Sequence, residues 1–90
     1  MLTPDFTNQF KRDYKLSEKR NLDMSLIDEI IEDLIAEKQL PKKHKDHALK
    51  GDYKGCRECH IQPDWLLIYR IVGEDIIFVR SGTHSDLFVK

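Results

Sequence analysis

Residues 53–82, YKGCRECHIQPDWLLIYRIVGEDIIFVRSG, decide the fold of this chain. Apolar runs of strand-forming residues alternate there with turn-forming tripeptides. The expected strands cover residues 53–61, 65–72 and 76–80, and the breaks between them are Gln62-Pro63-Asp64 and Gly73-Glu74-Asp75. Two consecutive strands joined by a tight turn run antiparallel. The segment therefore predicts a three-stranded antiparallel meander.

The meander should gather polar residues that are distant in sequence. In an up-down-up arrangement, the end of the first strand, the start of the second and the end of the third lie at one end of the sheet. These positions hold His60, then Asp64 with Trp65, then Arg80 with His84. Polar side chains at strand ends are typical of a functional site. We expect these side chains to converge.

Two amphipathic helices are predicted before the meander. The first has apolar residues at helical spacing, namely Phe6, Phe10, Tyr14 and Leu16. Thr3 or Asp5 is its expected N-terminal cap, with Pro4 in the first turn. The second has one apolar face opposite its acids, formed by Leu26, Ile27, Ile30, Ile31, Leu34 and Ile35. Pro41 is expected to stop this helix. Both helices need a sheet to cover.

Length and composition indicate one small α+β domain, residues 1–90. The chain is 40% hydrophobic and 34% charged, as in globular proteins with well-solvated surfaces. No stretch approaches the length of a membrane span, and the start MLTPDFTNQF lacks the features of a signal peptide. We therefore expect a cytoplasmic location and no membrane partner.

The net charge of -1 conceals a strong partition of charge along the chain. Residues 11–20 hold five basic side chains and residues 38–57 hold seven, whereas residues 23–37 carry six acids and no base. Such a partition suits a basic surface facing a polyanion, although solvated helix faces would produce it too. The segment 42–53 has no apolar period and is predicted to be a basic loop that contacts a ligand.

Cys56, Cys59 and His60 fit the C-x-x-C-H pattern of c-type haem attachment, and the cysteines alone could form a redox pair or half a zinc site. We expect no export signal, and the sequence has no second C-x-x-C. Positions three apart in a strand also point to opposite faces. We therefore interpret both cysteines as small buried apolar residues.

His47, His60 and His84 each lie near a strand end or in the basic loop. With Asp64 they could bind zinc, or they could perform acid-base chemistry. Cleavage of RNA by its own 2′-hydroxyl needs a base, an acid and cationic groups around the phosphate, and no metal or other cofactor. Histidine can transfer protons in both directions near neutral pH. Two aromatic residues beside this end of the sheet could stack on RNA bases, namely Trp65, which could instead cap the core, and Phe88.

Three motifs together resemble the YafQ branch of the RelE/ParE toxin superfamily. They are HALKG (residues 47–51), G-x-R-E-C-H-I-x-P-D-W-L-L-I-Y (55–69) and R-x-G-T-H-S-x-L-F (80–88). The resemblance spans nearly the whole chain. It implies a RelE-like fold with the order β-α-α-β-β-β and a short C-terminal turn or helix, in which Met1–Thr3 supplies the first strand. It also implies an mRNA interferase that enters the ribosomal A site and cuts the bound message.

The resemblance also implies roles for particular residues. The expected catalytic set is His47, His60, Asp64, Arg80 and His84, with Arg80 as phosphate clamp. The expected RNA-binding set is Lys45, Lys50, Lys54, Arg57, Glu58, Trp65 and Phe88, in which Glu58 is a helper on the strand of His60. His44 could join the site or only decorate the loop, and we favour decoration because it lies among Lys42, Lys43 and Lys45.

The expected partners are a cognate antitoxin, the ribosome with its mRNA, and operator DNA bound through the antitoxin complex. Two alternatives remain. ParE-like relatives inhibit DNA gyrase by binding, but they generally lack the histidine set. A non-catalytic member would bind only its antitoxin and DNA.

Overall fold

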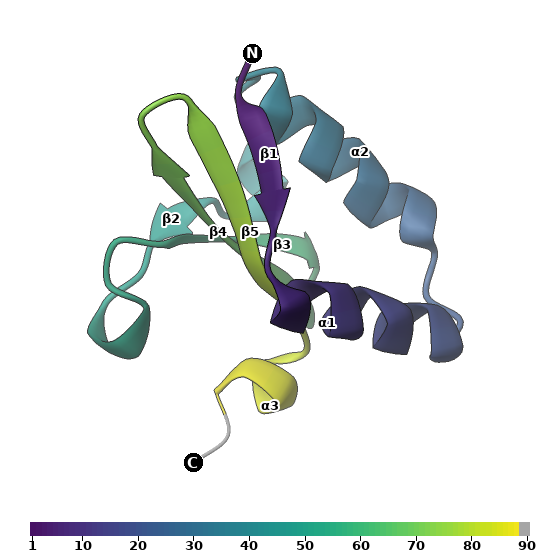
Figure 1. The fold of residues 1–90 in the computed structure, drawn as a ribbon. Helices are drawn as coiled ribbons and strands as arrows, with labels where there is room; N and C mark the ends of the chain where they lie inside the picture. The colour runs from purple at the N-terminus through teal and green to yellow at the C-terminus, as the bar shows by residue number, and fades with distance from the viewer. Residues whose placement is uncertain (89–90) are drawn as a thin grey trace.

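The computed structural model describes residues 1–88 and has the predicted α+β architecture (Figure 1). The last two residues of the expected domain lie outside the described part. The elements in chain order are β1 (Thr3–Phe6), α1 (Asn8–Lys19), α2 (Met24–Ile35), the 3-10 helix η1 (Lys42–His44), β2 (His47–Ala48), the 3-10 helix η2 (Gly51–Tyr53), β3 (Arg57–Gln62), β4 (Trp65–Val72), β5 (Asp75–Gly82) and α3 (His84–Leu87).

The strands form one mixed sheet in the order β1-β5-β4-β3-β2. The predicted meander is confirmed, because β3, β4 and β5 pair antiparallel in succession. Among the strands of the described residues, only β1 runs parallel to its neighbour, β5. The register shifts between Ile68 and Tyr69 opposite β5, so this pair of strands contains a bulge.

The start of the chain differs from the prediction. The first strand is Thr3–Phe6, not Met1–Thr3, and neither Thr3 nor Asp5 caps a helix. Pro4 is tolerated because β1 is an edge strand. The cap of α1 is Thr7, whose Oγ1 accepts from the Phe10 N–H (2.9 Å) and donates to the Val79 carbonyl (2.7 Å). Thr7 therefore both caps α1 and fastens it to β5.

The predicted apolar face of α2 is confirmed, with Ile27, Ile30, Ile31 and Leu34 buried. Pro41 does not stop this helix. Glu37 adopts a left-handed conformation (φ 60°), and the N–H groups of Glu37 and Lys38 bond to the Leu34 and Asp33 carbonyls. This pattern is a Schellman motif, which ends α2 at Ile35.

Apolar residues pack on both faces of the sheet. The larger cluster joins α1 and α2 to one face and includes Phe10, Ile30, Trp65 and Phe78. Leu16 does not join it and is 41% exposed. The smaller cluster, on the other face, consists of Cys56, Leu66, Ile68 and Leu87. Within residues 1–88, no helix is both long enough and apolar enough to span a bilayer.

The two cysteines support their interpretation as apolar residues. Cys56 and Cys59 are both free and buried, and they belong to clusters on opposite faces of the sheet. Burial raises the pKa of the Cys59 thiol to about 12, so it stays protonated at neutral pH.

The basic loop has more structure than expected. It contains two 3-10 turns and the strand β2, in which His47 and Ala48 pair with Glu58 and Arg57 of β3. A strand of two residues is too short to show an alternating pattern. Since η2 takes up Tyr53, the following strand begins at Arg57 and not at Tyr53.

Candidate active site

The predicted convergence at one end of the sheet is confirmed for His60, Asp64 and His84. The end of β3, the start of β4 and the end of β5 meet there, and α3 follows directly (Figure 1). The centroid of the His60 ring lies 5.8 Å from that of His84 and 6.3 Å from that of His47. Three imidazoles from three elements therefore form one cluster.

His84 is held by Asp64 through two hydrogen bonds. The backbone N–H of His84 donates to Asp64 Oδ1 at 2.9 Å, and the ring Nδ1 lies 2.6 Å from the same oxygen. These donors stabilise the ionised form of the Asp64 side chain, so its pKa is lowered, chiefly by the backbone N–H of His84. A carboxylate at Nδ1 places the ring proton on that nitrogen and leaves Nε2 for chemistry.

Glu58 lies between the other two histidines. Its Oε1 is 3.5 Å from Nε2 of both His47 and His60, and its side chain points to the same face of β3 as that of His60. Glu58 is only 5% exposed, and within residues 1–88 its Oε2 has no hydrogen-bond partner. A carboxylate so removed from water is stabilised by cationic neighbours.

The loop contributes two histidines with different contacts. His47 Nδ1 lies 2.5 Å from the Lys45 carbonyl, so acceptors face both of its ring nitrogens. His44 Nδ1 lies 2.7 Å from the His60 carbonyl and holds η1 against β3. Of the two alternatives for His44, decoration of the loop does not fit, because its ring fastens the loop beside the cluster. A groove of about 580 Å³ separates this loop from α2, and His60 and Lys45 line it.

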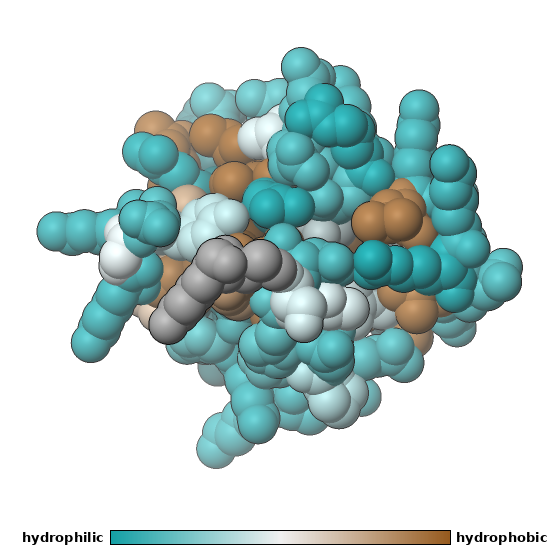
Figure 2. All heavy atoms as spheres, turned by 90° about the horizontal axis from the view of Figure 1, so that it is seen from below, coloured by the Kyte–Doolittle hydropathy of each residue, from teal (hydrophilic) through white to brown (hydrophobic). Residues whose placement is uncertain are grey.

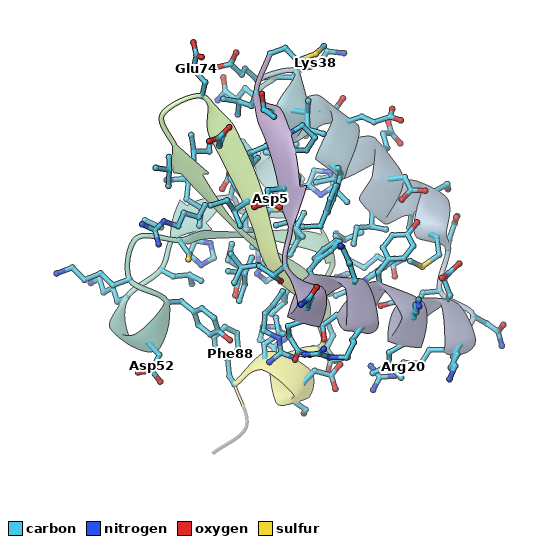
Figure 3. All side chains as sticks on the ribbon, viewed as in Figure 1. Asp5, Arg20, Lys38, Asp52, Glu74 and Phe88 are labelled. Carbon is cyan, nitrogen blue, oxygen red and sulfur yellow. The ribbon has the colours of Figure 1, made fainter. Side chains whose placement is uncertain are left out.

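The two predicted stacking residues differ in exposure. Trp65 is only 2% exposed and packs in the helix-covered core, so its ring offers no surface for a base. Its alternative reading, as a cap of the core, fits the structure. Phe88, at the end of α3 (Figure 3), is 42% exposed. Its ring meets the Tyr53 ring edge-on at 6.0 Å. Tyr53 was not among the predicted site residues.

Arg80 forms an ion pair with a residue that the sequence interpretation did not include. Its Nε and Nη2 donate to the two carboxylate oxygens of Asp13 in α1, both at 3.1 Å. This contact raises the pKa of the Arg80 guanidinium further, with a smaller contribution from Tyr53. The sequence does contain a signal for this contact: Asp13 is an acidic residue three positions after Phe10, on the buried face of an otherwise basic helix.

The basic residues of the predicted RNA-binding set lie around the loop. Lys45, Lys50 and Lys54 are exposed. Arg57 donates to Asp46 at 3.1 Å, and Asp46 also accepts from Tyr69, so part of the positive charge of Arg57 is neutralised. The end of the molecule that carries α1 and α3 is mostly hydrophilic, with long polar side chains at its rim (Figure 2).

No metal centre is evident in the described part of the chain. Among residues 1–88, no three His, Cys, Asp or Glu side chains are arranged to hold a metal ion. The carboxylates instead face the imidazoles as hydrogen-bond or charge partners.

The solved structures that share this fold over nearly the whole chain include bacterial toxins. The Escherichia coli YafQ chain of the DinJ-YafQ complex has a TM-score of 0.91, with 38% identity over 98% of this chain and 99% of that chain. A metal-bound toxin from Helicobacter pylori has a TM-score of 0.91, with 41% identity over 98% of this chain and 100% of that chain. The fold and the site therefore define a small bacterial toxin.

The family follows from the sequence comparisons. The family model described as "Bacterial toxin of type II toxin-antitoxin system, YafQ" matches residues 2–89. The protein named mRNA interferase toxin YafQ from Escherichia coli strain K12 is 40% identical over 85 residues, which cover 93% of this chain and 92% of that protein. The putative toxin YafQ of Haemophilus influenzae is 35% identical over 99% of this chain and 94% of its own length. The chain belongs to the YafQ family of type II toxins.

Proposed function

We propose that this toxin, acting as a single domain of residues 1–90, is an endoribonuclease that cuts mRNA in the ribosomal A site by metal-independent acid-base chemistry. One observation carries the proposal: the His84–Asp64 pair lies beside the His47–Glu58–His60 group at an accessible end of the sheet. Two separate sets of proton-exchanging groups are what this reaction requires. The printed name of the Escherichia coli relatives, mRNA interferase, supports the same activity.

The reaction needs two proton transfers around one phosphate. A base takes the proton of the ribose 2′-hydroxyl, and the 2′-oxygen attacks the phosphorus. The bond to the 5′-oxygen then breaks, an acid protonates that oxygen, and a 2′,3′-cyclic phosphate remains. His84 exchanges a proton at Nε2, because Asp64 holds Nδ1. The His47–Glu58–His60 group exchanges the other proton.

Glu58 joins the two imidazoles of this group. Its Oε1 lies 3.5 Å from Nε2 of both His47 and His60. His47 has acceptors at both ring nitrogens, the Lys45 carbonyl at Nδ1 and the Glu58 carboxylate at Nε2. One of the two sets supplies the acid, with His60 or His84 as the proton donor, and the other set supplies the base.

The remaining site residues bind the substrate. Arg80 neutralises charge on the phosphate, and Phe88 offers its exposed ring to a base, a contact worth about 1–3 kcal/mol. The exposed lysines of the loop, Lys45, Lys50 and Lys54, follow the RNA backbone. Arg57 adds to this surface, although Asp46 shares its charge.

The proposed partners follow from the family. A cognate antitoxin covers the basic surface and inhibits the toxin, as the DinJ-YafQ complex of the Escherichia coli relative suggests. The toxin-antitoxin complex binds operator DNA. The free toxin acts in the cytoplasm, where its ribosomal substrate is found.

The test is primer extension on a translated reporter mRNA, with and without ribosomes. Wild type, His84→Ala and Ser85→Ala are compared, the last being an exposed neighbour on α3 that serves as the matched control. We expect discrete cuts within codons, only with ribosomes, that vanish for His84→Ala and persist for Ser85→Ala. Cuts on free RNA would contradict ribosome dependence. No cuts from folded wild-type protein would contradict the nuclease and favour gyrase inhibition or a binding role.

A further inference from the structure

Asp13 has an unusual position for an acidic residue. It lies in the middle of α1, whose solvent side is basic, yet it is only 6% exposed. Burial of a carboxylate is costly unless its oxygens are fully hydrogen-bonded. Four N–H donors surround the Asp13 carboxylate at 3.0–3.1 Å, from Gln9 Nε2, Arg80 Nε, Arg80 Nη2 and the Ser81 backbone.

The two bonds from Arg80 form a fork. Nη2 donates to Oδ1 and Nε to Oδ2, so the planar guanidinium and the planar carboxylate meet along two parallel bonds. Such a bidentate pair fixes the orientation of the guanidinium as well as its position. The Ser81 N–H binds Oδ2 as well and ties the carboxylate to the backbone of β5.

The fork leaves donors free on the guanidinium. Arginine has five N–H donors, and the contact with Asp13 uses two of them. Within residues 1–88, both donors on Nη1 and one on Nη2 lie outside the fork with Asp13. Tyr53 contributes to the raised pKa of Arg80, and its ring meets Phe88, the exposed aromatic residue of the site. Asp13 thus holds one edge of the guanidinium, and the donors outside this fork are left for Tyr53 and for a substrate.

We propose that Asp13 is a positioning residue for the cleavage reaction. It aims the edge of the Arg80 guanidinium that lies outside the fork at the scissile phosphate. The inference rests on the proposed nuclease function. Asp13 touches neither the RNA nor the reacting atoms and acts only through Arg80. Its contribution is orientation, because a clamp already fixed in place needs no ordering when the charge on the phosphate develops.

Asp13→Asn should slow cleavage, whereas electrostatics alone would predict tighter binding of RNA. Asp13→Asn removes a negative charge next to a phosphate-binding arginine, so the attraction for RNA alone would increase. Loss of orientation instead lowers the rate of the chemical step. We therefore expect kcat to fall by about 10-fold or more while KM stays constant or decreases, since small displacements of catalytic groups cost up to about 100-fold.

The experiment is a double-mutant cycle on cleavage rate with purified toxin and programmed ribosomes. Asp13→Asn is introduced into wild type and into the Arg80→Ala variant, and Glu32→Gln on the exposed face of α2 is the charge-matched control. We expect a large loss of kcat in wild type, no further loss beyond about 2-fold in Arg80→Ala, and no change for Glu32→Gln. Equal losses in both backgrounds would overturn the inference, because Asp13 would then act independently of Arg80.

Two additional measurements keep the test decisive. Arg80→Lys retains the charge but not the planar fork, so it should lose about as much kcat as Asp13→Asn. Full activity of Arg80→Lys would overturn the inference even if Asp13→Asn failed to fold. Wild-type toxin that cuts no message would overturn the nuclease itself, whereas an active wild type with an additive cycle would overturn only the role of Asp13.

Discussion

Gly82 is the residue at which a single added methyl group should disturb the site most. It adopts φ +152°, a conformation that residues with a side chain rarely reach. A Cβ at this position would lie 2.9 Å from both Cβ and Oδ2 of Asp86. Asp86 cannot easily move away, because it accepts from Thr83 in the cap of α3 and from Arg20 at 2.7 Å.

The loss of folding stability in Gly82→Ala has two contributions, the backbone strain at Gly82 and the steric clash with Asp86. Backbone strain in such a conformation is about 1–3 kcal/mol. Overpacking against a fixed neighbour adds about 1–3 kcal/mol. The matched control is Gly73→Ala, at φ +60° with no atom within 4 Å of the new Cβ. The control carries only the left-handed strain of about 1–2 kcal/mol. Because both variants carry backbone strain, the difference between them is chiefly the overpacking term, so we expect Gly82→Ala to be less stable than Gly73→Ala by at least about 1 kcal/mol.

Thermal unfolding followed by circular dichroism measures this difference. In a domain of this size, 1 kcal/mol corresponds to about 4–8 °C in Tm, so Gly82→Ala should melt at least about 4 °C below Gly73→Ala. Cleavage should fall as well, because α3 carries His84 and would be pushed from its place. Equal melting temperatures for the two variants would refute the close packing of Gly82 against the cap.

Three further outcomes are expected. Thr7→Ala should destabilise the protein by about 1–2 kcal/mol in urea unfolding, since Thr7 both caps α1 and bonds to β5; no change in midpoint would show that neither contact matters. Arg20 and the α3 cap lower the pKa of Asp86 from 3.8 to about 2, so its contribution to stability is complete above about pH 4 and lost as pH falls through about 2. Asp86→Asn should flatten that part of the stability profile, and a profile unchanged by the substitution would contradict this linkage. Excess EDTA, followed by return of the magnesium that ribosomes need, should leave the number of cuts per toxin unchanged; a loss restored only by a transition metal would contradict metal-independent cleavage.

Much of the sheet could be predicted from the sequence, because its signals are local. The tripeptides after Ile61 and after Val72 mark both turns of the meander, and the long apolar run between them marks a strand that is buried along most of its length. Antiparallel pairing then follows from the short connections. The convergence of His60, Asp64 and His84 required no further information, since topology alone brings strand ends together.

The errors at the N-terminus have a local cause as well. Thr3, Pro4 and Asp5 are typical of a helix start, and Phe6 lies four residues before Phe10. The segment nevertheless forms an edge strand beside β5, where Phe6 still packs against Phe10 and Phe78. Pairing with a strand more than seventy residues away outweighed the local preference, and no pattern within the segment reveals such a partner.

The alternation of side chains along a strand decides between the two interpretations of Trp65, as a residue that stacks on a base or as a cap of the core. It is the first residue of β4 and points to the same face as Leu67 and Tyr69, which α1 and α2 cover. Asp64, one residue earlier, lies outside the strand and is exposed. The sequence places both at the correct end of the sheet, but the face depends on where the helices pack.

The geometry of the site depends on a helix that carries none of the predicted catalytic residues. Helix α1 is bound to β5 and its extension at three points: Thr7 bonds to Val79, Asp13 to Arg80 and Ser81, and Arg20 to Asp86 in the α3 cap. Two of these contacts hold Arg80 and Asp86, which lie before and after His84 in the sequence. Displacement of α1 from the sheet would therefore release the arginine and the histidine together, even with β3 and β4 intact. Substitutions on the buried side of α1 should consequently reduce cleavage before they reduce the stability of the sheet.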